Sequence, residues 1–149
     1  ERNVYRVLPR RRVLCHVGTQ AHAEDDLLHQ IAAVLAVGGQ AWVPPEAAAL
    51  RERLPQAARA AVQLRQQGGP ALLAMKMDAA LVHAPPEEVL ALAGQLATPS
   101  AERPMPIVGL TALAPGDTQV PLARLVSERC ITTNTAAAGG NASLMVLAA

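Results

Sequence analysis

The residues best placed for cofactor chemistry lie at a short turn near the start of the chain. Gly18 follows an apolar run and precedes a helix-like stripe of apolar residues. In a doubly wound α/β domain such a turn holds a pyrophosphate through a G-x-G-x-x-G pattern, because glycines let the backbone approach the phosphates. Here Gly18 stands alone, and Glu24, Asp25 and Asp26 place three carboxylates where phosphates would dock. The sequence therefore argues against nucleotide binding.

The cysteines and histidines are the next candidates for chemistry. Cys15 lies inside a predicted buried strand and Cys130 at the start of another, and an apolar setting makes a thiol unreactive, so we expect both to be structural. His22 and His29 are typical of a solvated helix face. No histidine has a metal-site spacing to a cysteine or carboxylate, so we expect no metal site. His83 ends a predicted strand, where open α/β sheets place ligands.

Two hypotheses about this edge of the sheet remain open at this point. In the first, the nucleotide turn is defective and the chain has no catalytic or cofactor-binding residues. In the alternative, the chain is a small α/β ligand-binding or enzymatic domain that uses the strand ends near Gly18 and His83. The alternative requires a concave pocket with convergent polar groups at those strand ends.

Length, charge and composition exclude several classes of protein. The 149 residues suit one domain, and two cysteines cannot build a disulfide framework, which favours a reducing cytoplasm. A net charge of +1 and 1% aromatic residues argue against a nucleic-acid-binding domain, including one acting through the arginines of residues 1–12. No run of 18 or more apolar residues occurs, so we predict no membrane span, and no secretory signal is recognisable at residue 1.

The elements that must position these residues follow from the apolar pattern. Apolar runs alternate with helical stripes, which predicts an α/β fold: a parallel sheet of about five strands with helices on both faces. Strands are expected at 13–17, 40–43, 79–83, 106–110 and 129–133, and helices at 23–37, 46–54, from 86 to about 97, and 122–126. Residues 60–64 are a strand or a helix end, and 68–70, 97–105 and 112–119 are loops.

The two ends of the chain differ from this α/β pattern. Pro9 blocks a helix, so residues 1–11 are expected to be an extended linker, followed by the α/β domain over 12–130. A strand and an extended tail are expected over 131–149. The tail is small and uncharged, and its glycines allow close approach to another backbone. It is either a disordered terminus or a segment that docks on a surface outside this chain, through Asn134, Thr135, Ala136, Ala137, Ala138, Gly139, Gly140, Asn141, Ala142, Ser143, Leu144 and Met145.

This tail resembles the C-terminal motif of the long bacterial proline utilization A proteins. Three other stretches are similar to the same family: the start through Tyr5, Pro9 and Cys15, the run 32–38, and residues 122–129. The resemblance covers nearly all of the chain. It is most specific in the tail, whereas the middle matches mainly in its hydrophobic pattern.

The resemblance implies a role that composition alone does not give. The parent would oxidise proline to glutamate by an FAD-dependent proline dehydrogenase and an NAD-dependent glutamate semialdehyde dehydrogenase, with channelling between them. This chain would be the C-terminal domain, similar to the Rossmann-type domain of aldehyde dehydrogenases but without cofactor or catalysis. Its partner would be the upstream aldehyde dehydrogenase module of the same polypeptide or of a neighbouring protomer, where residues 134–145 help cover the tunnel. The parent would be cytoplasmic, with peripheral contact at the inner membrane face left open.

Overall fold

The main body of the protein is a sheet of five parallel strands. The computed structural model describes residues 2–99 and 108–133. The strand order is β4-β3-β2-β5-β6, and every neighbouring pair is parallel. The strands are β2 (Arg12–Val17), β3 (Gln40–Val43), β4 (Val62–Leu64), β5 (Ala79–His83) and β6 (Gly109–Leu113). The chain starts in the middle of the sheet and adds strands first on one side, then on the other, which is the doubly wound Rossmann-like order. This confirms the predicted fold class.

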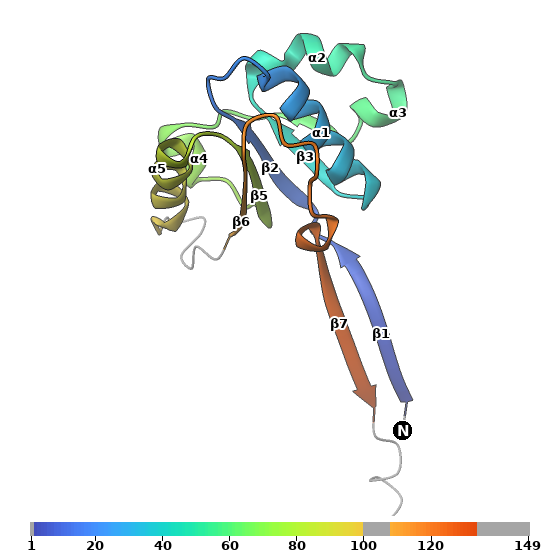
Figure 1. The fold of residues 1–149 in the computed structure, drawn as a ribbon. Helices are drawn as coiled ribbons and strands as arrows, with labels where there is room; N and C mark the ends of the chain where they lie inside the picture. Colours follow the sequence, from blue (N-terminus) through green and yellow to red (C-terminus); the bar gives the residue numbers. More distant parts are fainter. Residues whose placement is uncertain (1, 100–107, 134–149) are drawn as a thin grey trace, which may run out of the picture. The chain divides into compact units, whose positions relative to one another are not determined.

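Helices cover both faces of the sheet (Figure 1). One face carries α1 (Ala23–Ala36) and, after β3, the 3₁₀ turn η1 (Pro45–Ala47) with α2 (Ala48–Arg53). The other face carries α4 (Gly69–Leu73) and α5 (Pro86–Ala97). The short helix α3 (Gln56–Arg59) precedes β4, and the 3₁₀ turn η2 (Leu122–Leu125) follows the loop after β6.

The pleat of the strands divides the core into two layers. On β2, Val13 and Cys15 pack with Ile31 and Val34 of α1, whereas Leu14 points to the opposite face and joins the cluster of α4 and α5. All three β2 side chains are fully buried. Because successive side chains of a strand point to opposite faces, an almost continuous apolar run is what a doubly covered strand requires.

Two glycines follow helix α1 and end it. Gly38 has a φ of 83°, which glycine adopts without steric cost, and the Gly39 amide donates to the Val34 carbonyl at 2.9 Å. A side chain at Gly39 would meet the Arg10 carbonyl at 2.9 Å. The turn therefore returns the chain directly into β3.

A separate unit is formed by two long strands, β1 (Arg2–Pro9) and β7 (Val126–Thr133). They pair with each other in a two-stranded sheet, and their arrows run in opposite directions in Figure 1. Most residues of both strands are exposed, including Tyr5, Val7 and Ile131. A two-stranded ribbon without a covered face is at best marginally stable in water.

Several local predictions differ from the structure. Residues 2–9, expected as a linker, form strand β1, and Cys130, expected to be buried, is exposed on β7. Helix α4 begins at Gly69, where a loop was predicted, because a proline at the first helical positions favours a helix start. Strand β6 spans Gly109–Leu113, past the predicted end at residue 110, and residues 106 and 107 of the predicted strand lie outside the described residues. Residues 134–145 of the predicted docking tail lie outside the described residues.

Candidate functional site

The place to look for a ligand is the switch point between β2 and β5. These two central strands belong to opposite halves of the winding, and ligands of such sheets bind beyond the carboxyl ends of the strands at this point. Here the strands end at Val17 and His83, which lie opposite each other in the register. The Gly18 amide then donates to the His83 carbonyl at 2.8 Å, so the turn continues the pairing of the strands.

Two side chains of the protein itself fill the space at Gly18. A methyl group added there would collide with the carboxylate of Glu88, from the first turn of α5, and would lie 2.8 Å from the Gln20 Oε1. The Gln20 amide group donates to the His83 carbonyl at 2.9 Å. The backbone at Gly18 therefore faces a carboxylate and an anchored amide.

Asp26 ties the loop after β6 to the start of α1. This carboxylate is 1% exposed and accepts the Gln20 amide at 2.9 Å and the Gly116 backbone N–H at 3.0 Å. Gly116 has a φ of 82°, the left-handed region that favours glycine. A backbone donor that could bind an anionic ligand is thus used by an internal carboxylate.

His83 is fully buried, and both of its ring nitrogens have hydrogen-bond partners. Its Nδ1 lies 2.8 Å from the Gln30 Nε2, which donates, and its Nε2 lies 2.8 Å from the Asp117 carbonyl, which accepts. This arrangement fits the neutral ring with its proton on Nε2. The Gln30 Nε2 also donates to the His16 carbonyl at 2.8 Å. Through these hydrogen bonds His83 and Gln30 link β2, β5, α1 and the loop after β6.

These residues do not fit a dinucleotide at the turn. A pyrophosphate needs free backbone N–H groups and a close approach at the first glycine, and it is repelled by carboxylates. Here Glu88 occupies the approach to Gly18, and Asp26 takes the Gly116 amide. A small cavity includes Asp26 and Gly116, together with His22, Asp25, His29 and Thr118, but neither Gly18 nor His83 lines it. This cavity therefore gives no support to the ligand-binding alternative at those two residues.

Sequence reasoning missed the residues that close this edge. It singled out Gly18 and His83, but not Gln20, Gln30 or Glu88, which satisfy or cover them. Two glutamines could have indicated these contacts: Gln20, just before α1, and Gln30, on the otherwise apolar inner face of α1. A fully buried Gln30 requires polar partners across the sheet.

The structure also places the other candidate side chains, Cys15, His22 and His29. Cys15 is fully buried, as predicted, and this burial raises the pKa of its thiol far above its usual value, so the thiol is a poor nucleophile. His22 and His29 line a small cavity of about 230 Å³ with Asp25 and Asp26. Across residues 2–99 and 108–133 no three metal-ligating side chains lie together.

Helix length bears on membrane insertion. The longest helix of the described ranges, α1, has 14 residues, and none there is both long and apolar enough to cross a bilayer.

The fold defines a class, a Rossmann-like α/β domain, and at its switch point Glu88 and Gln20 lie against Gly18. No family model matches the sequence. The chain is, however, similar in sequence to curated proteins. The chain is 41% identical over 149 residues to the bifunctional protein PutA of Salmonella typhimurium and 42% identical over 149 residues to that of Escherichia coli. It is 36% identical over 141 residues to that of Klebsiella aerogenes.

These matches show which proteins the chain is homologous to, and over which part of their length. They cover 93–99% of the chain but only 10% of each relative. The chain is therefore homologous to one segment of the PutA proteins and spans about a tenth of their length.

Proposed function

We propose that this chain is a non-catalytic domain of a bifunctional proline-catabolic enzyme, the C-terminal one. In this role it packs on the aldehyde dehydrogenase module, of the same polypeptide or of a neighbouring protomer, and helps cover the channelling tunnel between two active sites. The observation that carries the proposal is the switch point, where Glu88 and Gln20 stand in the place of a cofactor. Homology to PutA over nearly the whole chain supports the assignment to that enzyme.

The chemistry of the parent then lies outside this chain. A flavin-dependent proline dehydrogenase and an NAD-dependent dehydrogenase of glutamate semialdehyde would use FAD and NAD in their own modules. This chain contributes surface and shape rather than reacting groups, and it contacts neither nucleic acid nor membrane through a span of its own. We place the parent in the cytoplasm.

The exposed ribbon of β1 and β7 supports a packing role. Tyr5 and Val7 on β1 and Ile131 on β7 are 60%, 54% and 44% exposed, which is costly for large apolar side chains. Strand β7 directly precedes the tail in sequence, and in this proposal Asn134 to Met145 contact the same neighbouring module. In this proposal the tail is the segment that covers the tunnel.

Two measurements test the proposed function. Calorimetry of the isolated chain with NAD should show no binding, and micromolar affinity would contradict the filled switch point. Deletion of residues 134–149 from the full parent should lengthen the lag before NADH appears from proline. As a control, each of the two oxidation steps is assayed separately with its own substrate added. If both steps run at the wild-type rate while the lag lengthens, the defect lies in channelling. An unchanged lag would argue against the tail's role.

A further inference from the structure

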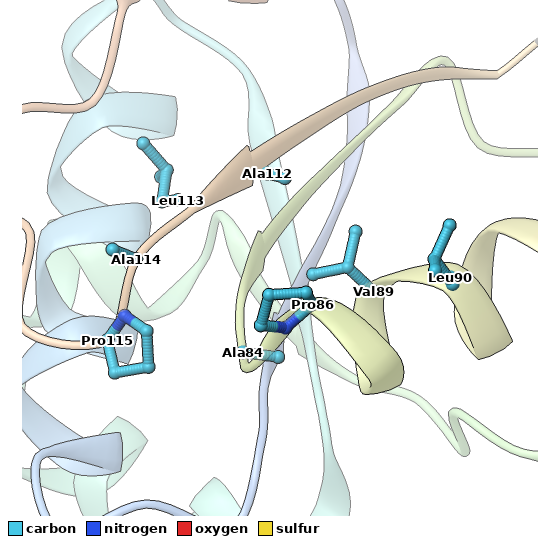
Figure 2. A pocket seen from close by; sticks show the side chains of 8 residues that line it. All are labelled: Ala84, Pro86, Val89, Leu90, Ala112, Leu113, Ala114 and Pro115. Carbon is cyan, nitrogen blue, oxygen red and sulfur yellow. The ribbon is translucent and has the colours of Figure 1, made fainter.

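An apolar groove lies on the α5 side of the sheet, away from the filled switch point. Its volume is about 470 Å³. Figure 2 shows the start of α5 on one side and the end of β6 with the following loop on the other. All lining side chains are apolar: Ala84, Pro86, Val89, Leu90, Ala112, Leu113, Ala114 and Pro115. Leu90 is 73% exposed, more than any other large hydrophobic residue of the described ranges.

The groove runs beside the outer edge of β6, which is the last strand of the sheet. No described strand pairs with that edge. Proteins usually protect such an edge with charges, proline or a very short strand. Strand β6 reads Gly-Leu-Thr-Ala-Leu and has none of these, and its exposed positions, Gly109 and Ala112, are small enough to let another backbone approach.

The opposite edge of the same sheet shows the contrast. Strand β4 has only three residues, Val62–Leu64, and Arg65 follows it directly. The Arg65 guanidinium donates to the Gln63 Oε1 at 2.6 Å and lies 5.3 Å from the centre of the Trp42 ring. A short strand with a fixed cation beside it is poor at pairing. One edge of the sheet is therefore protected, whereas the β6 edge has no pairing strand among residues 2–99 and 108–133.

We infer that an extended, apolar segment of the parent polypeptide, outside this chain, adds to β6 as a sixth strand and places alternate side chains in the groove. The inference rests on the proposed function, because it takes the chain as a domain of a larger protein. The chain spans about a tenth of its PutA relatives, so ample polypeptide remains to supply such a strand. Main-chain hydrogen bonds to β6 would give affinity, and the groove would select apolar side chains.

A second copy of this chain fits the same surface less well. A symmetric edge-to-edge dimer pairs β6 with its copy in antiparallel orientation. The carboxyl end of β6, where the groove lies, would then face the amino end of the copy, where Gly109 has no side chain to fill it. A separate apolar strand has no such restriction.

The test is made in the full-length parent, with Leu90→Lys as the variant and Ala91→Lys as the matched control. Both positions are exposed on α5, but only Leu90 lines the groove. Hydrogen exchange of the outward amides of residues 109–113 should be about tenfold faster in Leu90→Lys than in the wild-type parent. It should be unchanged in Ala91→Lys. Slow exchange in β2 and β5 reports that the domain remains folded.

Cross-linking identifies the occupant. A photoreactive benzoylphenylalanine at position 90 of the parent should yield one cross-linked peptide from the polypeptide preceding Glu1. The inference would be overturned if position 90 cross-linked only to a second copy, only to residues 100–107 or 134–149, or to nothing. Equal hydrogen exchange in Leu90→Lys and Ala91→Lys would also overturn it.

The outcome is separable from that of the proposed function. A cross-linked upstream strand together with an unchanged lag after tail deletion would keep this inference and reject the tunnel role. The reverse pair of results would keep the tunnel role and reject the added strand.

Discussion

Replacing His83 with alanine tests whether the switch point is a structural contact or a site for chemistry. The side chain is fully buried and makes two hydrogen bonds of 2.8 Å, to Gln30 and to the Asp117 carbonyl. Removing it leaves one hydrogen of the buried Gln30 amide without a partner, at a cost of about 1–3 kcal/mol, and loses a bond worth about 1 kcal/mol to Asp117. We expect the variant to lose about 2–4 kcal/mol of unfolding free energy.

The assay is urea unfolding of the 149-residue chain followed by circular dichroism. The unfolding free energy of a small domain falls by about 2 kcal/mol per molar urea, so the urea midpoint of unfolding should fall by about 1–2 M. His22→Ala is the matched control, because His22 is exposed and has no such contacts, and it should move the midpoint little.

Activity of the full parent completes the experiment. At a temperature where His83→Ala is still folded, both oxidation steps should run at the wild-type rate. A loss below about 1 kcal/mol would refute the structural role. A stable variant with one oxidation step abolished would show that His83 takes part in chemistry.

Three further predictions follow from other contacts. The Arg12 side chain, by its hydrogen bonds, lowers the pKa of Asp78, so the pair stabilises the fold above the carboxyl's unfolded pKa near 4 and ceases to do so as pH falls through the lower folded pKa. Asp78→Asn should therefore cost about 1 kcal/mol of unfolding free energy in urea titrations at pH 7, and this cost should shrink as the pH is lowered through the folded pKa; a cost independent of pH would count against the ion pair. In the isolated chain a thiol reagent should modify Cys130 within seconds to minutes and Cys15 only upon unfolding, as read by mass spectrometry; equal rates would contradict the burial of Cys15. Gly94 is exposed inside α5 with nothing within 4 Å of an added methyl group, so Gly94→Ala should raise stability by about 0.5–1 kcal/mol in the same urea assay, and a loss would contradict that open space.

The central strands and both long helices could be predicted because their signals are local. The run 13–17 is apolar except for His16, and the stripe from Leu27 to Val34 has helical spacing, so each element is determined by adjacent residues. The end of strand β6 was predicted three residues too early, because small and apolar residues continue through Leu113 without a sharp boundary.

The features that were missed depend on contacts between distant residues. Strand β1 pairs with β7, more than a hundred residues later, and nothing in residues 2–9 indicates that partner. The partners of His83 lie 53 and 34 residues away. A strand-end histidine looks the same in sequence whether it faces a substrate or a buried glutamine, so only the fold distinguishes the two.

The pairing of β1 with β7 has a mechanical consequence. The polypeptide enters the α/β body just after β1 and leaves it just before β7, and at that junction the Arg10 amide donates to the Leu125 carbonyl at 2.8 Å. Tension applied through the two flanking strands would therefore separate β1 from β7 one hydrogen bond at a time. The five-stranded sheet would bear tension only after β1 and β7 had separated, so a pull on the two flanking strands would not at first distort the Rossmann-like core.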